Sequence, residues 1–156
     1  MPTSDTWRGR TGTAVAMLLL CKARLTVSIV PFARWRAGLG FATGTDGTIS
    51  DAKRLAAVLE RAAHRLPFET KCLPRSMALS WMLRQAGIGH SVIFGVRPTG
   101  CRDNADALHA WVEVQGVRIL GDLPGKWIET LRLGEAAAPW ANNRDKVIAN
   151  LYTVKH

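Results

Sequence analysis

The sequence predicts an α+β fold in which N-terminal helices pack on an antiparallel β-sheet. Apolar residues recur at spacings of three and four in the first half of the chain, and they alternate with a period of two from residue 90 onward. The first pattern is typical of amphipathic helices and the second of strands. Helices grouped before strands, without repeated alternation of the two, indicate an α+β fold.

The N-terminal helical segment, residues 14–37, is basic and apolar. The run "AVAMLLLCKARLTVSIV" leads to Pro31, and "PFARWRAGLG" begins again at that proline. Proline is tolerated in the first turn of a helix but not in its interior, so we expect two short helices or one kinked helix. The apolar run is shorter than the ~20 residues that cross a bilayer, and no A-x-A cleavage site follows it. These features favour a helix that faces the core or lies on a membrane surface over an export signal.

Two further helices are predicted. After a loop rich in glycine and threonine, Ser50 is the expected N-cap of a helix that ends at Pro67. The next helix runs from Cys72 to Ala86 and is closed by Gly87. The apolar positions of the first of these helices, at helical spacing, are Leu55, Val58, Leu59, Ala62 and Leu66.

Strands follow the helices. The segment "HSVIFGVRP" (90–98) alternates in polarity and predicts a strand, and the polar segment 99–106 predicts a loop. The segments "ALHAWVEV" (107–114) and "VRILGD" (117–122) are joined by a Gln-Gly pair, which predicts a β-hairpin. A further strand is expected over 127–133, and the remainder of the chain has no pattern that assigns it to a helix or a strand.

Composition narrows the class of protein. A chain of 156 residues with 47% hydrophobic and 21% charged residues fits one globular domain over residues 1–156. The three cysteines are an odd number without C-x-x-C spacing, which fits neither a disulfide framework nor a zinc ribbon and suits a reducing cytoplasm. The net charge of +9 suits an anionic partner, but the basic residues form no run of five and no nucleic-acid-binding motif occurs. We therefore expect no nucleic-acid partner, no metal and no cofactor.

The predicted hairpin places a histidine opposite a carboxylate. If Gln115 and Gly116 form a two-residue loop, Val114 faces Val117, and each further opposed pair lies one residue farther along both strands. One face then pairs small or apolar residues, while on the other Glu113 faces Arg118 and His109 faces Asp122. A three-residue loop with a bulge at Gly116 would instead shift the register and separate His109 from Asp122.

Cys72 is the candidate nucleophile for this histidine. It stands at the start of a predicted helix, where free backbone N–H groups and the helix dipole favour a thiolate, and Lys71 and Arg75 add positive charge. A histidine held in one tautomer by a carboxylate is the base that such a thiol requires. The N–H of Cys72 is also positioned to stabilise an oxyanion. Cys101 is a competing thiol, but it lies in a polar loop with no helix N-terminus beside it.

Each of these residues also has a structural interpretation. A lone cysteine is often a small buried hydrophobe, and a strand histidine beside an aspartate often makes a purely structural hydrogen bond. A metal site built from Cys72, Cys101, His90 and His109 lacks a recognised ligand spacing. His64 is expected to be structural or solvated.

Four segments together resemble the transglutaminase-like cysteine proteases, and more closely the B2 leader peptidases of lasso peptide biosynthesis: "CLPRSMALSWMLRQAG", "HSVIFGVRP", "HAWVEV" and "GD". The run "LLLCKARLTVSIVPFARWRAGLG" is similar to the opening of B2 proteins, so the resemblance covers most of the chain. It implies a papain-like catalytic core in residues 50–156, with Cys72 as nucleophile, His109 as base and Asp122 as orienting acid of a Cys-His-Asp triad. Trp111 is a candidate substrate contact.

The resemblance also implies a substrate and partners. The expected reaction is hydrolysis that removes the leader from a ribosomally synthesised precursor peptide, which frees the core N-terminus for ring closure by a lasso cyclase. A leader-binding B1 protein is expected to act in trans, since no such domain precedes the N-terminal helices. Those helices are the expected docking site for a partner and a point of contact with the membrane surface of a cytoplasmic protein.

The sequence departs from the papain pattern in one respect and leaves two other function classes open. Papain-like enzymes carry a glutamine shortly before the nucleophile, and residues 50–71 contain none, so the second oxyanion donor has no candidate. An acyl transferase of transglutaminase type would use the same three residues and pass the acyl group to an amine. A non-catalytic binding module would instead bury an inert Cys72.

Overall fold

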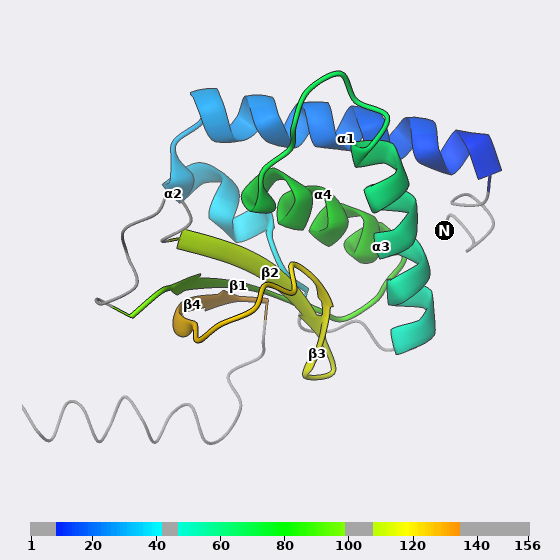
Figure 1. The fold of residues 1–156 in the computed structure, drawn as a ribbon. Helices are drawn as coiled ribbons and strands as arrows, with labels where there is room; N and C mark the ends of the chain where they lie inside the picture. The colour runs from blue at the N-terminus through cyan, green and yellow to red at the C-terminus, as the bar shows by residue number, and fades with distance from the viewer. Residues whose placement is uncertain (1–8, 42–46, 99–107, 135–156) are drawn as a thin grey trace, which may run out of the picture.

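The fold has helices first and strands after them. A computed structural model describes residues 9–41, 47–98 and 108–134. The strands β1 to β4 form an antiparallel sheet in the order β3-β2-β1-β4, which confirms the predicted α+β fold (Figure 1). The elements are the helices α1 (Gly9–Ile29), α2 (Phe32–Trp35), η2 (Arg36–Gly38, a 3-10 helix), α3 (Ile49–Ala63) and α4 (Cys72–Gln85), and the strands β1 (Ser91–Val96), β2 (Leu108–Val114), β3 (Val117–Leu120) and β4 (Ile128–Leu133).

Helix α4 is the centre of the molecule. It lies between α1 on one side and the sheet on the other, and α3 packs beside it (Figure 1). Because α4 meets neighbours on several sides, most of its residues after the first turn are buried. The position and direction of its first residue, Cys72, are therefore fixed by the packing of the whole core. Its buried residues are Pro74, Ser76, Met77, Ala78, Leu79, Ser80, Met82 and Leu83.

The N-terminal helices break where proline predicts. Helix α1 ends at Ile29, and Pro31 is the N-cap of α2. The indole Nε1 of Trp35 donates to the carbonyl of Val30 at 3.1 Å and closes the corner between the two helices. In the described chain α1 begins at Gly9, five residues earlier than expected, and it is long and apolar enough by composition to cross a membrane. The expectation that this run is too short for that is therefore wrong.

Helix α3 begins at a different N-cap from the predicted one. Thr48, not Ser50, caps the helix: its Oγ1 accepts the N–H of Asp51 at 3.1 Å, and the Asp51 carboxylate accepts the N–H of Thr48 at 3.3 Å. These hydrogen bonds to Thr48 also lower the pKa of Asp51. The reciprocal pair is a capping box, which satisfies two backbone groups where a cap by Ser50 would satisfy one. The helix ends at Ala63, before Pro67.

Helix α4 matches its predicted bounds closely. It ends at Gln85 with Ala86 as C-cap, and Gly87 follows with a φ of 70°. The N–H of Ile88 donates back to the carbonyl of Leu83 at 2.9 Å. This is the Schellman arrangement, in which a glycine adopts the left-handed conformation just beyond the helix. The predicted closure by Gly87 is confirmed.

The hairpin has the predicted loop but a different register. Gln115 and Gly116 have φ values of 51° and 76°, as in a two-residue type I′ turn. The first two pairs beyond the loop also match the prediction. A bulge then follows, so that Val112 pairs with Leu120 and not with Ile119. An extra residue in one strand shifts every later pair, so the predicted pairs beyond the bulge are wrong.

The remaining strands complete the sheet. Val92 and Ile93 of β1 are both fully buried, and because successive strand residues point to opposite faces, β1 is covered on both faces. Strand β4 confirms the strand expected over 127–133. The loop over 99–106, with Cys101, and the C-terminal segment without a pattern lie outside the described residues.

Candidate active site

Cys72 lies at the N-terminal end of α4, with hydrogen-bond donors around its thiol. Helix geometry leaves the N–H groups of Cys72 and Leu73 without intrahelical acceptors, and Pro74 has no N–H. The N–H groups of Leu73 and Ala110 hydrogen-bond to the sulfur, which is partly exposed. The N–H of Cys72, at the first position of the helix, has no intrahelical acceptor and can donate to a ligand.

Two hydrogen bonds through Ala110 fix α4 against β2. The N–H of Ala110 bonds the Cys72 sulfur, and its carbonyl accepts the hydroxyl of Ser76 at 3.1 Å. Ser76 lies one turn after Cys72 on the same helix face, and it is fully buried. Because Ala110 follows His109 in the strand, these bonds set the distance between the thiol and the imidazole.

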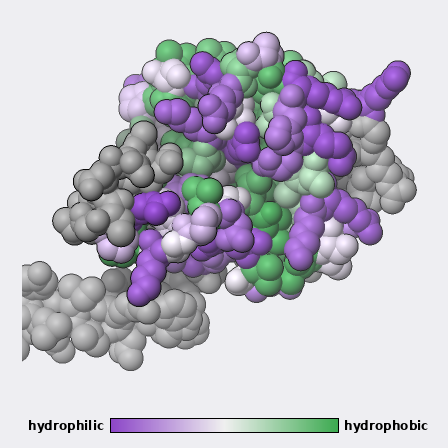
Figure 2. Space-filling view, in the orientation of Figure 1, coloured by the Kyte–Doolittle hydropathy of each residue, from purple (hydrophilic) through white to green (hydrophobic). Residues whose placement is uncertain are grey.

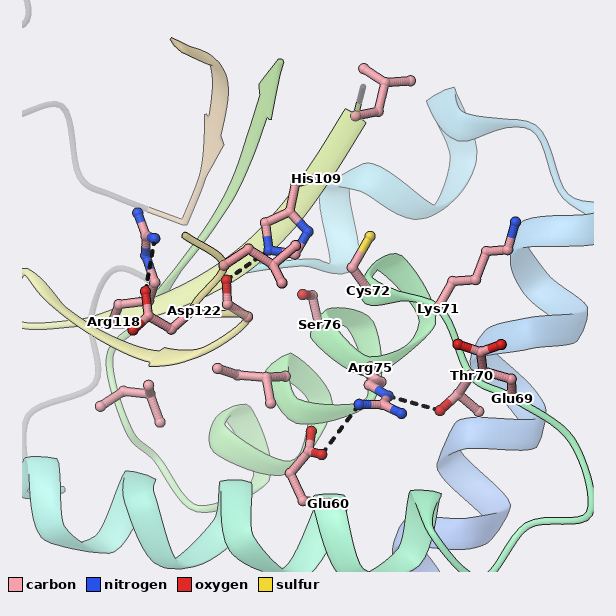
Figure 3. A pocket seen from close by; sticks show the side chains of 15 residues that line it. Glu60, Glu69, Thr70, Lys71, Cys72, Arg75, Ser76, His109, Arg118 and Asp122 are labelled. Carbon is pink, nitrogen blue, oxygen red and sulfur yellow. Dashed lines mark hydrogen bonds and ion pairs between the residues drawn. The ribbon is translucent and has the colours of Figure 1, made fainter. Parts of the chain in front are cut away.

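The ring of His109 is held between a carbonyl and the thiol. Its Nε2–H donates to the carbonyl of Gly121 at 2.7 Å. A carbonyl can only accept, so the neutral ring carries its proton on Nε2 and keeps a lone pair on Nδ1. The other ring nitrogen faces the sulfur of Cys72 (Figure 3). Nδ1 is therefore the atom that can take the thiol proton.

The pKa values of Cys72 and His109 shift toward an ion pair. Burial raises the pKa of the Cys72 thiol, but hydrogen bonds from His109, Ala110 and Leu73 together lower that pKa below its ordinary value. Burial lowers the pKa of His109, but hydrogen bonds to Cys72 and to the Gly121 carbonyl together raise that pKa above its ordinary value. Both shifts favour a thiolate beside an imidazolium, which is the reactive form of such a pair.

The predicted pairing of His109 with Asp122 is wrong. The Asp122 carboxylate accepts from Arg118 at 3.3 Å, and its side chain is 89% exposed. The predicted register ends at the bulge in β3, and beyond it the imidazole meets the carbonyl of Gly121 instead. Gly121 has a φ of 83°, and a Cβ there would lie 2.9 Å from the carbonyl oxygen of Ala110. A backbone carbonyl, held by a glycine, takes the position expected for the acid.

The predicted cations do not act on the thiol. Arg75 Nε donates to Thr70 at 2.9 Å, and its Nη1 bonds Glu60 at 3.2 Å. Figure 3 shows the guanidinium turned toward these two residues and Lys71 extending away from the sulfur. Arg75 therefore braces the loop before Cys72 against α3, and the pKa of the thiol is lowered by His109 and backbone N–H groups.

Trp111 does not face the cleft. It is 3% exposed, its Nε1 donates to Glu113 at 2.8 Å, and Arg118 lies over its ring at 4.6 Å. A Cβ at Gly95 would lie 2.7 Å from the indole, so the ring packs closely over that glycine. The proposed substrate contact by Trp111 is not supported, because the ring is buried within the sheet.

Trp127 is a neighbour of His109 that the sequence analysis missed. Its ring centroid lies 5.1 Å from that of His109, and the Arg97 guanidinium lies 4.7 Å from its centroid. The indole therefore packs against one side of the imidazole and helps to hold its position. The sequence signal, an aromatic residue in the loop "LPGKW", suggested only the start of a strand.

A cleft of about 740 Å³ opens in front of Cys72 and His109 (Figure 3). Helices α3 and α4 and the loop between them form one wall, which is mainly polar. The other wall, from β2, β3 and the segment after β3, exposes leucine and isoleucine side chains beside an ion pair. The first wall consists of Glu60, Glu69, Thr70, Lys71, Cys72, Arg75 and Ser76, and the second of Leu108, His109, Arg118, Ile119, Leu120, Gly121, Asp122 and Leu123.

The other candidate residues lie elsewhere. His90 is buried and has a structural role: its Nδ1–H donates to the Ile88 carbonyl at 2.8 Å, and its Nε2 accepts the Ser80 hydroxyl at 2.7 Å. Burial lowers the pKa of His90. His64 is exposed, as expected for a solvated residue. Within residues 9–41, 47–98 and 108–134, no three His, Cys, Asp or Glu side chains gather into a metal-binding group.

A thiol at a helix N-terminus that faces a histidine on a strand is the arrangement used by enzymes with a cysteine nucleophile and a histidine base. The chain belongs to the transglutaminase-like superfamily, whose family model matches residues 17–130. This superfamily includes cysteine peptidases and acyltransferases. The matched region contains both Cys72 and His109. Comparisons with curated proteins and with solved structures gave no match.

Proposed function

We propose that the protein is a cysteine peptidase that removes the leader from a ribosomally synthesised lasso peptide precursor. The observation that carries the peptidase proposal is the Cys72–His109 pair, with shifted pKa values, at the surface of an open cleft. The resemblance of most of the chain to B2 leader peptidases supports the precursor as substrate. Without a metal or a nucleotide, this pair is sufficient for peptide hydrolysis.

The first half of the reaction forms a thioester. Nδ1 of His109 takes the proton of the Cys72 thiol, and the thiolate attacks the scissile carbonyl carbon. The oxyanion that forms accepts a hydrogen bond from the N–H of Cys72. The protonated imidazole, stabilised by the Gly121 carbonyl, then gives its proton to the leaving nitrogen, and the C–N bond breaks. The core peptide leaves with a free amine, and the leader remains bound as a thioester.

The second half regenerates the enzyme. Nδ1 of His109, now neutral, takes a proton from water as the oxygen attacks the thioester carbonyl. Collapse of the oxyanion breaks the C–S bond, and the sulfur leaves as a thiolate beside the imidazolium. The leader departs with a new carboxylate.

The cleft suits an extended peptide. Its apolar wall, with Leu108 and Leu123 exposed, can take aliphatic side chains of the substrate, while the opposite wall presents charged groups such as Lys71 and Glu69. We propose that a leader-binding B1 protein presents the precursor in trans and that a lasso cyclase consumes the product. A reducing cytoplasm keeps the nucleophilic thiol free.

Acyl transfer is the second candidate, because the superfamily includes acyltransferases that would share the thioester. The two are separated by incubating the precursor, with the leader-binding protein, in ¹⁸O-labelled water with an added primary amine. Hydrolysis predicts ¹⁸O in the new leader carboxylate and an unmodified leader mass otherwise. A leader that carries the amine would replace the peptidase proposal by a transferase. An intact precursor, with a Cys72 that iodoacetamide labels slowly at neutral pH, would favour a binding module.

A further inference from the structure

We infer that the outer face of α1 docks the protein onto an anionic membrane surface. Leu18, Leu25 and Ile29 are 70%, 60% and 75% exposed. At 3.6 residues per turn these three lie within about 40° of one another around the helix. The opposite side of the helix, with Ala16 and Leu20, is fully buried in the core. Helix α1 is therefore apolar on two sides, and packing within the described chain accounts for one of them.

The apolar face continues into the next helix. Phe32 of α2 is 40% exposed and follows Ile29 across the proline corner. Figure 2 shows hydrophobic side chains along the upper edge of the molecule, where α1 runs in Figure 1, with hydrophilic side chains between them. We call Leu18, Leu25, Ile29 and Phe32 the α1 face. An apolar strip of this kind, bordered by polar groups, marks an interaction surface.

Charge identifies the partner of the α1 face. The segment 9–41 contains five basic residues and no acidic residue, and all five basic side chains are exposed. An apolar face on a segment that carries exposed cations and no carboxylate of its own matches the interface of an anionic lipid leaflet. The aliphatic side chains would enter the headgroup region while the cations meet lipid phosphates. The basic residues are Arg10, Lys22, Arg24, Arg34 and Arg36.

Docking on the surface fits the packing of α1, and spanning the bilayer does not. The helix is long and apolar enough to cross a membrane by composition. However, Ala16, Leu20 and Ala23 are fully buried in a core that α1 shares with α3 and α4. Insertion of α1 across a bilayer would expose that core to water. The helix can therefore keep its inner face on the protein and place its outer face on lipid.

The test is sedimentation of the full-length protein with vesicles. We expect binding to an equimolar mixture of phosphatidylcholine and phosphatidylglycerol about tenfold or more tighter than to phosphatidylcholine alone, with loss at high salt. Replacing one cation, as in Lys22→Gln or Arg34→Gln, should weaken binding about fivefold. The triple variant Leu18→Ser, Leu25→Ser and Ile29→Ser should lose about tenfold or more, because its apolar contacts are gone.

Ile128→Ser is the matched control, because Ile128 is 52% exposed on β4, away from the α1 face, and its variant should bind as the wild type does. Far-UV circular dichroism and the alkylation rate of Cys72 are the measurements that check whether the triple variant is folded. Wild-type protein that stays in the supernatant, or a triple variant that binds as well as the wild type, would overturn the inference. A wild-type dimer that the triple variant abolishes, without vesicle binding, would assign the α1 face to a second copy and would also overturn it. The inference is independent of the peptidase proposal, because Cys72→Ala should bind vesicles normally.

Discussion

Replacement of Asp122 by asparagine tests which group orients His109. In the structure the Gly121 carbonyl accepts the Nε2–H at 2.7 Å, while the Asp122 carboxylate bonds Arg118 at 3.3 Å and is 89% exposed. An exposed ion pair contributes about 0–1 kcal/mol. Even if all of this were lost in the transition state, kcat/KM for Asp122→Asn would fall no more than about fivefold.

An orienting carboxylate would give a very different result. In a Ser-His-Asp triad the corresponding Asp→Asn change lowers kcat about 10⁴-fold, because the amide stabilises the wrong tautomer of the histidine. The amide introduced by Asp122→Asn has no such effect on His109 when Nε2 already donates to a backbone carbonyl. The two arrangements therefore differ by about three orders of magnitude in rate.

The assay is kcat/KM for precursor cleavage, followed by liquid chromatography and mass spectrometry. The alkylation rate of Cys72 by iodoacetamide supplies a second readout that needs no peptide. His109→Ala is the control for complete loss of the base. A decrease of about a thousandfold in Asp122→Asn, with an unchanged circular dichroism spectrum, would refute orientation by the Gly121 carbonyl.

Three further predictions follow from the site and the helix caps. His109→Ala removes a hydrogen bond that lowers the pKa of Cys72 and leaves the burial that raises it. The inflection in the plot of alkylation rate against pH should therefore move to higher pH. An unmoved inflection would show that His109 does not influence the thiol. Gly121→Ala places a Cβ 2.9 Å from the Ala110 carbonyl oxygen at a φ of 83°, which should displace the Gly121 carbonyl from His109. We expect kcat/KM to fall more than about tenfold. Activity near that of the wild type would show that the Gly121 carbonyl is not needed to orient His109. Thr48→Ala should cost about 1 kcal/mol of unfolding free energy, measured in urea, while Ser50→Ala should be near neutral; the reverse order would contradict the capping box.

The hairpin illustrates how far sequence predicts the site. The Gln-Gly loop and the first pairs were predictable, because a two-residue turn fixes the register beside it. The bulge that follows was not predictable. Ile119 is apolar and suits either face of a strand, so the alternation of polar and apolar residues gives no sign of an extra residue at this position. Beyond the bulge Asp122 no longer faces His109, and the imidazole bonds the Gly121 carbonyl. The position of Cys72, by contrast, was predictable from the proline and the apolar run that follow it.

Helix α3 shows a signal that was available but not used. The spacing Thr48-x-x-Asp51 is a capping-box pattern, whereas Ser50 has no acidic partner three residues later. The contact between Trp127 and His109 had no comparable signal. It joins the segment before β4 to β2, and such long-range packing depends on the sheet order, which local sequence patterns do not specify.

Loss of precursor cleavage in a single cysteine variant tests the central claim, that Cys72 is the nucleophile. The three cysteines allow matched substitutions, each by alanine, at Cys21, Cys72 and Cys101. The measurement is the rate of leader release from the precursor in the presence of the leader-binding protein. We predict that Cys72→Ala releases no leader while the other two variants retain wild-type rates. Leader release by Cys72→Ala at the wild-type rate would contradict the account.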